Sequence, residues 1–232
     1  MPPDFFFNSP HVLALTSNGA VNFAPADFDV PLTGSQSAYL KEACGVDIPR
    51  VFWRRQVHGD VIMTAQGGPE SVKGCPDADA YITAEKHLPI AIRTADCVPV
   101  LIFDPLTPAI GLAHAGWKGT QRRIAAKTVE KMCAAFGSRP VSLKAVLGPS
   151  IRPCCYQVGE EFRQHFPKDV VERQGSLYAD MPGANRRQLE EAGLKPGNIV
   201  DGGICTCCNK KYFSFRRDAD KAGRMITLMM LL

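Results

Sequence analysis

Three side chains that commonly bind metals stand at separate points of the chain: His58 in Gln-Val-His-Gly-Asp, Cys97 in Ala-Asp-Cys-Val-Pro, and His114 in Ala-His-Ala-Gly-Trp. Imidazole and thiolate are preferred zinc ligands, and three protein ligands leave the fourth tetrahedral position open, which is typical of a catalytic site. The alternative is that the histidines are hydrogen-bonded structural residues and that Cys97 is a small buried side chain. The spacing of the three residues leaves both interpretations open.

Each of these residues lies at an end of a predicted strand, where a scaffold can hold a side chain firmly against a cleft. His58 follows the first strand, Cys97 lies between the fourth and fifth, and His114 ends the sixth. The strands are predicted from short runs rich in β-branched and aromatic residues, separated by turn residues. They cover residues 51–57, 61–65, 80–83, 90–94, 98–103 and 109–114.

The rest of the chain predicts helices around these strands. The surest helix runs from about 120 to 136, because its apolar residues follow the three-and-four spacing of one buried face and Gly137 is a stop signal. Further helices are expected at 35–44, 158–166 and 184–192, and further strands at 141–147, 198–201, 212–215 and 225–232. We therefore predict an α/β or α+β fold with a mixed sheet core and helices outside, forming one domain over residues 1–232.

Composition narrows the function classes. The 232 residues carry a formal net charge of +4 without a dense basic stripe, so nucleic acid is not an expected partner. The chain shows neither the pattern of a secretory signal nor an apolar run long enough to cross a membrane. Its nine cysteines are an odd number for a disulfide framework. We expect a cytoplasmic monomer or small homo-oligomer with reduced thiols.

Two further groups of cysteines stand in the second half, Cys154-Cys155 and Cys205-Thr-Cys207-Cys208. A structural zinc ion shared between them is one interpretation. Reduced, partly buried thiols are the preferred one, because no second well-spaced pair of cysteines or histidines clearly completes four ligands.

A series of motifs extends from Val51 to the carboxyl terminus and resembles, in the same order, the YfiH/laccase-domain family. Members of this family are variously labelled polyphenol oxidase, purine nucleoside phosphorylase and peptidoglycan editing factor. The motifs are Gln56-Val-His58-Gly59, Ala78-Asp79-Ala80, Thr94-Ala-Asp96-Cys97-Val-Pro-Val100, His114-Ala-Gly-Trp117, Gly148-Pro149, Cys154-Cys155-Tyr-Gln-Val-Gly159, Cys205-Thr-Cys207 and Phe213-Ser-Phe-Arg216-Arg217.

The resemblance implies a fold, a ligand set and an activity. The fold is a pair of packed mixed sheets flanked by helices, related to cysteine hydrolase folds, and the metal ligands are His58, Cys97 and His114. The substrates are phosphate and the purine nucleosides adenosine, guanosine, inosine and methylthioadenosine, with hydrolytic deamination of adenosine as a second reaction. The family usually carries an amino-terminal Thr-Arg where this chain has Asn18, which cannot supply an arginine's charge to an anionic substrate.

The metal chemistry has two rival interpretations. Two histidines and a cysteine are also the ligands of a blue copper site. A multicopper oxidase needs a histidine-rich trinuclear cluster as well, and only His11, His87 and His165 remain to build it. Zinc acting as a Lewis acid is therefore favoured, although copper also binds nitrogen and sulfur sites strongly. A metal-free alternative uses Cys97 as the nucleophile of a hydrolase that edits peptidoglycan precursors.

Other roles are assigned by residue type. Asp96 and Cys97 are the candidate catalytic residues, with Asp96 or Asp79 donating a proton to the leaving base or orienting a histidine. The alternative is that Asp96 only caps a turn. Arg216 and Arg217 are the candidate phosphate-binding residues, or else one of them is a solvated charge on an edge strand. Trp117 either stacks on a base or belongs to the core.

Overall fold

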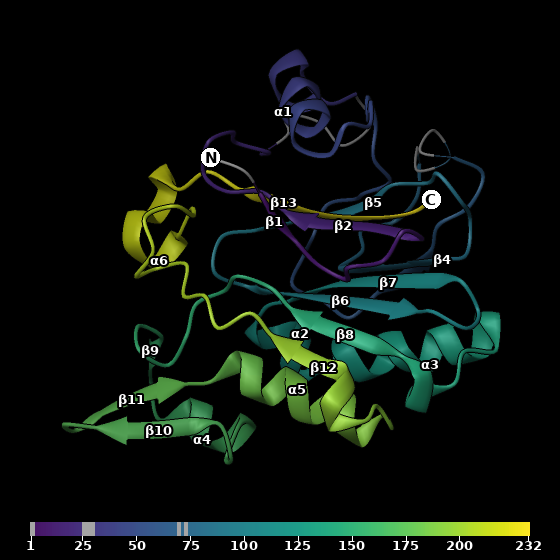
Figure 1. Cartoon of the computed structure of the whole chain (residues 1–232). Coiled ribbons are helices and arrows are strands. Elements are labelled where there is room, and N and C mark those ends of the chain that lie inside the picture. The colour runs from purple at the N-terminus through teal and green to yellow at the C-terminus, as the bar shows by residue number, and fades with distance from the viewer. Residues whose placement is uncertain (1–2, 25–30, 69–70, 72–73) are drawn as a thin grey trace.

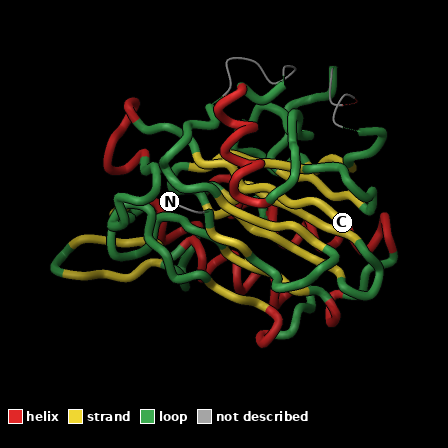
Figure 2. Tube along the Cα trace, turned by 45° about the horizontal axis from the view of Figure 1, so that its top comes forward, coloured by secondary structure: helices red, strands yellow, loops and turns green. Residues whose placement is uncertain are grey.

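The computed structural model describes residues 3–24, 31–68, 71 and 74–232, and two β-sheets packed face to face form its centre. Figure 1 shows helix α1 (Gly34–Cys44) on the outer side of one sheet, and helices α2 (Trp117–Gln121), α3 (Ile124–Phe136) and α5 (Met181–Glu191) beyond the other. Figure 2 shows the strands running side by side through the middle of the molecule, with most helices at the periphery. This arrangement confirms the predicted class.

The larger sheet has six strands in the order β12-β8-β6-β7-β4-β3. It is mixed, because β12 pairs parallel to β8 and β3 pairs parallel to β4, while the other neighbours are antiparallel. Its central strands are buried along their whole length, as the continuous apolar runs predict. The bounds are β3 Ile62–Thr64, β4 Ala80–Thr83, β6 Val98–Asp104, β7 Ala109–Ala115, β8 Lys144–Leu147 and β12 Ile199–Asp201.

The smaller central sheet has four strands in the order β1-β2-β13-β5, and every pair in it is antiparallel rather than mixed. A separate three-stranded ribbon, β10-β11-β9, was not predicted. The bounds are β1 Asp4–Phe5, β2 Val12–Thr16, β5 Ile90–Thr94, β13 Met225–Leu231, β9 Gln157–Val158, β10 Val170–Arg173 and β11 Ser176–Ala179.

The long helix predicted over 120–136 is divided into α2 and α3. Arg123 breaks it, because this residue adopts the left-handed conformation (φ 63°) in front of α3. Helix α3 then ends at Gly137, which is also left-handed, as the sequence indicates. The remaining short helices are α4 Glu161–His165 and α6 Phe215–Asp218, with 3₁₀ turns at Pro140–Ser142, Pro196–Asn198 and Ala219–Lys221.

Two predicted strands are absent. Residues 51–57 form only an isolated bridge from Phe52 to Ile90, because Gln56 uses its side-chain amide to hydrogen-bond both backbone groups of Arg93. The segment 212–215 is a loop that leads into α6, since the Ser214 hydroxyl caps that helix.

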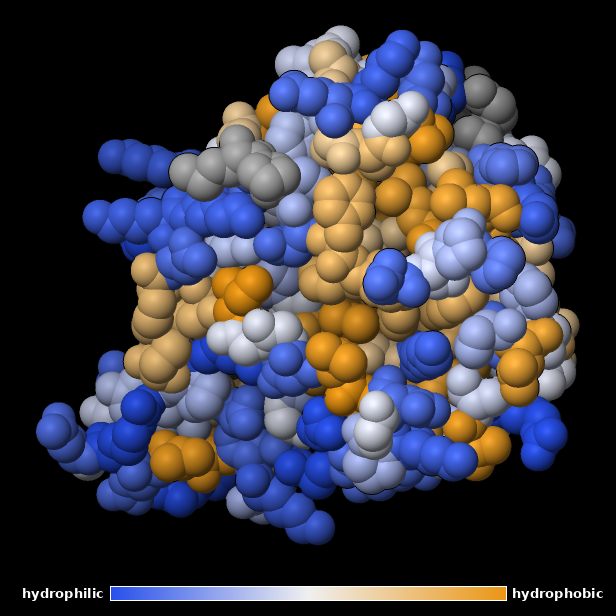
Figure 3. Space-filling view, in the orientation of Figure 1, coloured by the Kyte–Doolittle hydropathy of each residue, from blue (hydrophilic) through white to orange (hydrophobic). Residues whose placement is uncertain are grey.

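The core consists of three apolar clusters that follow the layers. One lies between the two sheets and includes Tyr81 and Leu112, one lies under α3 and α5, and one lies under α1 around Leu40. Figure 3 shows hydrophobic side chains gathered over β1 and β2, where Phe5 is exposed, with hydrophilic side chains at the margins. No helix within the described ranges has both the length and the apolar character that a membrane span requires.

The contact between α3 and the sheet yields a test of the packing. A Cβ atom at Gly111 of β7 would lie 2.8 Å from Met132 Sδ and 3.0 Å from Thr128 Cγ2 of α3. We expect Gly111→Ala to lower the free energy of unfolding by about 1–3 kcal/mol through overpacking, measured by urea denaturation. Gly197→Ala is the matched control, since nothing lies within 4 Å of its added Cβ. Equal stability of the two variants would contradict the packing.

Candidate metal centre

Three residues of the site lie in a row because of the strand register. Strand β7 lies between β4 and β6, and it is antiparallel to both, so its carboxyl end meets their amino ends. His114 near the end of β7 therefore lies beside Asp79, which precedes β4, and beside Cys97, which precedes β6. The backbone N–H of His114 donates to the carbonyl of Asp79 at 2.7 Å.

His58 reaches the same point from a loop. It adopts the left-handed conformation (φ 58°), and its ring centroid lies 4.8 Å from that of His114. The candidate ligand atoms of His58, Cys97 and His114 all lie within 4.8 Å of one another. The structure thus brings together the three residues that the sequence singles out.

The carboxylate of Asp79 fixes both histidines. It is fully buried and accepts hydrogen bonds from the backbone N–H groups of Val57, His58 and Gly59 at 2.7–3.1 Å. It also lies 2.8 Å from Nδ1 of His114, and we assign the proton to that nitrogen. Nε2 is then the nitrogen of His114 that can bind a metal, and it does so after losing its proton.

The close approach of the ligands requires a glycine. A Cβ atom at Gly116 would lie 2.8 Å from Cδ2 of His58 and 3.1 Å from Sγ of Cys97. Any larger residue would push the imidazole and the thiol away from their positions. The glycine of the His-Ala-Gly-Trp motif therefore has a steric role at the site.

Charges of opposite sign stabilise the site. Burial by itself raises the pKa of Cys97, but the His114 and His58 imidazoles outweigh it and lower the pKa to about 6. Burial acts against protonation of His114, yet the Cys97 thiolate and the Asp79 carboxylate raise its pKa to about 9. Cys97 is thus held as a thiolate, the form that binds metals.

The three ligand residues open into a pocket of about 730 Å³. Three arginines line it: Arg93 from β5, Arg216 from α6, and Arg224 just before β13. Burial, and next the neighbouring Arg224 guanidinium, lower the pKa of Arg93 to about 10, so it remains charged at neutral pH. Cations that repel one another beside a metal site are suited to hold an anion. Aromatic side chains of Trp117, Tyr156 and Phe215 complete the wall.

Asp96 holds one side of this pocket. It is buried, and its two carboxylate oxygens accept hydrogen bonds from the Thr206 hydroxyl and from the backbone N–H of Arg216, each at 2.6 Å. The residue lines the pocket, but both of its oxygens are engaged with protein donors. The carboxylate that orients a histidine is Asp79, the other of the two candidates.

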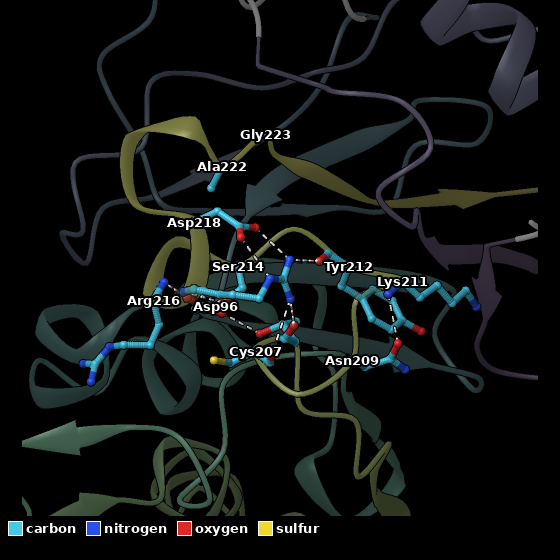
Figure 4. A network of polar contacts seen from close by, with 12 residues as sticks. Asp96, Cys207, Asn209, Lys211, Tyr212, Ser214, Arg216, Asp218, Ala222 and Gly223 are labelled. Atoms are coloured by element: carbon cyan, nitrogen blue, oxygen red, sulfur yellow. Dashed lines mark hydrogen bonds and ion pairs between the residues drawn. The ribbon is translucent and has the colours of Figure 1, made fainter.

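The two adjacent arginines point in different directions. The Arg216 guanidinium lies over the Tyr156 ring, 5.2 Å from its centroid, and donates to the carbonyl of Gln157. Figure 4 shows the Arg216 side chain pointing away from the network around Tyr212 and Asp218. Arg217 belongs to that network: it donates to the carbonyls of Thr206, Cys207 and Tyr212 and pairs with Asp218, and it does not line the pocket.

Trp117 fits both interpretations of its role, because it lines the pocket and also packs on Phe162 at 5.4 Å between ring centroids. Asn18 is buried, accepts a hydrogen bond from the N–H of Ala20, and does not line the pocket.

Sequence reasoning missed several pocket residues. The sequence does mark Arg93 as unusual, since it is a charged residue within the apolar strand Ile-Ala-Ile-Arg-Thr. It does not mark Arg224, because the approach of Arg224 to Arg93 depends on the pairing of β5 with β13.

The donor set fits a zinc ion. The ligand atoms of two imidazoles and a thiolate lie within 4.8 Å of one another, and the buried Asp79 orients one imidazole as carboxylates do at zinc sites. The remaining histidines, His11, His87 and His165, belong to neither of the potential metal-binding groups found among the described residues. The residues thus fit one metal ion here and offer no histidine-rich cluster beside it.

Comparisons with known proteins find relatives over most of the chain. Residues 25–232 match the family described as "Multi-copper polyphenol oxidoreductase laccase". A purine nucleoside phosphorylase of Deinococcus radiodurans is 42% identical over 175 residues, which cover 73% of this chain and 66% of that relative's length. A protein named as an adenosine deaminase, from an unknown prokaryotic organism, is 34% identical over 79% of this chain and 76% of its own length. The crystal structure of the Bacillus licheniformis hypothetical protein YfiH superposes with a TM-score of 0.83 at 27% identity, covering 98% of this chain and 99% of that one.

The central position of Asp79 can be tested by metal binding. We expect Asp79→Asn to weaken zinc affinity by about 10–100-fold, because the amide lacks the charge that supports His114 and part of the acceptor capacity that holds the His58 loop. Competition with a chromogenic chelator measures the affinity. The control is Asp77→Asn, which removes only an exposed ion pair with Arg55. Unchanged affinity in Asp79→Asn would refute the positioning role.

Proposed function

Because the chain belongs to the family described as multi-copper polyphenol oxidoreductase laccase, several of whose members are named purine nucleoside phosphorylase, we propose that it is a zinc-dependent purine nucleoside phosphorylase. Its proposed substrates are adenosine, guanosine, inosine and methylthioadenosine together with phosphate. The observation that carries the proposal is the placement of a metal-ligand set and three arginines around one pocket.

The proposed metal ligands are His58, Cys97 and His114. A zinc ion bound there would act as a Lewis acid with an open coordination position. The protein itself would supply the orientation: Asp79 holds His114 through Nδ1 and holds the loop of His58 through backbone N–H groups. The arrangement keeps both rings in place without help from substrate.

Phosphate would bind to the arginines of the pocket. In phosphorolysis a phosphate oxygen forms a bond to the anomeric carbon of the ribose, the bond from that carbon to the base nitrogen breaks, and the base takes up a proton. Arg93, Arg216 and Arg224 offer the planar forks of donors that suit phosphate oxygens. We assign phosphate binding to Arg216, which lines the pocket, and not to Arg217, which does not line it and donates to the carbonyls of Thr206 and Tyr212.

Arg224 also offsets the missing amino-terminal arginine. It stands just before β13, and Asn18 stands just after β2, the strand that pairs with β13. The two positions are therefore neighbours at the same end of the sheet. We propose that Arg224 supplies positive charge where the family's usual arginine is replaced by Asn18.

The purine would lie against the aromatic wall. Phe215 is half-exposed in the pocket, and Tyr156 lies opposite the Arg216 guanidinium, so both offer apolar surface to a flat base. Burial, and next the Cys97 charge, raise the pKa of Tyr156 to about 12, so its hydroxyl stays protonated and can donate to a base nitrogen. Asp96 is assigned a positioning role for Arg216, and Cys97 is assigned to the metal.

Hydrolytic deamination of adenosine is proposed as a second reaction of the same pocket. The relative named as an adenosine deaminase supports it. A zinc ion held by His58, Cys97 and His114 would supply activated water for this reaction, in which a carbon–oxygen bond forms at the amino-bearing carbon of adenine, the carbon–nitrogen bond breaks and ammonia leaves. Both reactions would use the same metal ligands.

One geometric observation favours a second candidate function. Asp79, His114 and Cys97 follow one another as orienting acid, base and nucleophile do in cysteine hydrolases. A metal-free hydrolase acting on peptidoglycan precursors would use this line, with Cys97 forming an acyl-enzyme.

The main test is turnover of inosine and adenosine with and without phosphate, with metal content measured on the same sample. We expect hypoxanthine release from inosine to require phosphate, one zinc ion per chain at this site, and loss of both activity and that ion in His58→Ala. Equal rates without phosphate would exclude the phosphorylase. Hydrolysis of a peptidoglycan precursor by zinc-free protein, with an acyl adduct trapped on Cys97, would support the hydrolase instead.

The role of Arg224 can be tested separately from that of the metal. We expect Arg224→Gln to raise KM for phosphate by about 10–100-fold, because a charge-assisted hydrogen bond is worth about 1.5–3 kcal/mol, while zinc content stays unchanged. Steady-state kinetics with varied phosphate provide the measurement. Arg163→Gln serves as the control, since Arg163 lies on α4 and pairs with surface glutamates. An unaltered KM in Arg224→Gln would remove Arg224 from the phosphate site.

A further inference from the structure

A second group of potential metal ligands lies outside the centre described above. It consists of Cys154, Cys155, Cys205 and Cys208, whose sulfur atoms all lie within 4.8 Å of one another. We refer to it as the four-cysteine cluster. The Sγ atom of Cys208 lies 3.6 Å from that of Cys154 and 3.2 Å from that of Cys155.

Parallel strand pairing brings these cysteines together. Strands β8 and β12 are parallel neighbours, so the chain leaves both of them at the same edge of the sheet. The turn after β8 carries Cys154 and Cys155, and the turn after β12 carries Cys205 and Cys208. A bridge between Ser150 and Cys205 keeps the two turns together. The sequence alone shows no second well-spaced pair of ligands beside Cys205 and Cys208. In the structure the adjacent residues Cys154 and Cys155 form that pair.

The distances suit a tetrahedral thiolate site. Zinc–sulfur bonds of about 2.3 Å place the sulfurs of a tetrahedron about 3.8 Å apart, and Cys208 Sγ lies 3.6 and 3.2 Å from the sulfurs of Cys154 and Cys155. Cys205 and Cys208 have the Cys-x-x-Cys spacing common at structural zinc sites. A disulfide would join only two of the four sulfurs and would not explain why all four converge.

The backbone around the cluster suits sulfur ligands. The backbone N–H groups of Cys208 and Arg152 donate hydrogen bonds to the sulfur of Cys205, as donors next to a ligating thiolate do.

We propose that the four-cysteine cluster binds one zinc ion as a structural tetrathiolate site that ties the turn after β8 to the turn after β12. This site is separate from the centre formed by His58, Cys97 and His114 and does not depend on the activity proposed for it.

The two tied turns form part of the pocket wall. The turn after β8 leads directly into Tyr156, which lines the pocket. The turn after β12 carries Thr206, whose hydroxyl donates to Asp96, and Asp96 in turn holds the backbone of Arg216. The zinc ion would therefore hold the side of the pocket where Tyr156 and Arg216 meet.

Cobalt binding in the Cys97→Ala background tests the proposal. That substitution removes the only thiol of the first centre's ligand set, so any thiolate-to-cobalt charge-transfer absorption must come from other cysteines. We expect the full chain, purified with a non-chelating reductant, to saturate at one equivalent of cobalt with the absorption of a tetrahedral thiolate site. Zinc should displace the cobalt and raise the midpoint of thermal unfolding.

A second substitution in the Cys97→Ala background shows which thiols bind the cobalt ion. Adding Cys208→Ser, or separately Cys154→Ser, should abolish the one-equivalent absorption; both residues are exposed, so we expect these variants to fold. Cys75→Ser is the matched control and should leave it intact, since Cys75 belongs to neither group of potential metal ligands found among the described residues. Absence of saturable cobalt absorption, its persistence in Cys208→Ser, or a disulfide among the four cysteines in protein that zinc does not stabilise would each overturn the proposal.

Discussion

The buried carboxylate of Asp79 is the interaction on which the metal centre depends. Four donors converge on it, three from the backbone of the His58 loop and one from the His114 ring. A carboxylate without solvent needs such donors, because an unpaired buried charge is costly. The left-handed conformation of His58 also has a cost, and the converging N–H groups offset it. Removing this one acid would release one ligand and leave the other without its orienting partner.

Much of the scaffold could be predicted from the sequence, because continuous apolar runs define buried strands. The ranges 80–83 and 90–94 were predicted with the observed bounds. The errors arise where side chains replace backbone pairing: Gln56 occupies the backbone groups of Arg93, and Ser214 caps a helix where a strand was expected. The Gln56 contact joins residues 37 positions apart, which local pattern does not encode, whereas Ser214 caps its own helix through a local hydrogen bond that competes with a strand.

The site itself was predictable in part for the same reason. His58, Cys97 and His114 could be named because each stands at the end of a recognisable run, but their convergence depends on the antiparallel register of β7 with β4 and β6. The pocket arginines depend on pairings between strands far apart in sequence, so Arg93 could be noticed and Arg224 could not. The same holds for the four cysteines, since adjacent Cys154 and Cys155 complete a site only when β8 and β12 run parallel.

Two buried carboxylates, Asp79 and Asp96, hold different parts of the pocket around Cys97. Asp79 accepts hydrogen bonds from His114 and from the loop of His58. Asp96, whose backbone is in the left-handed conformation (φ 88°), accepts hydrogen bonds from Thr206 and from the backbone of Arg216. Cys97 directly follows Asp96, so the position of the thiolate is tied to the loops that carry the arginine and the four cysteines. The two sides of the pocket therefore meet at the Asp96–Cys97 turn. Thr206, which lies between Cys205 and Cys208, is the residue through which the turn of the four-cysteine cluster contacts Asp96.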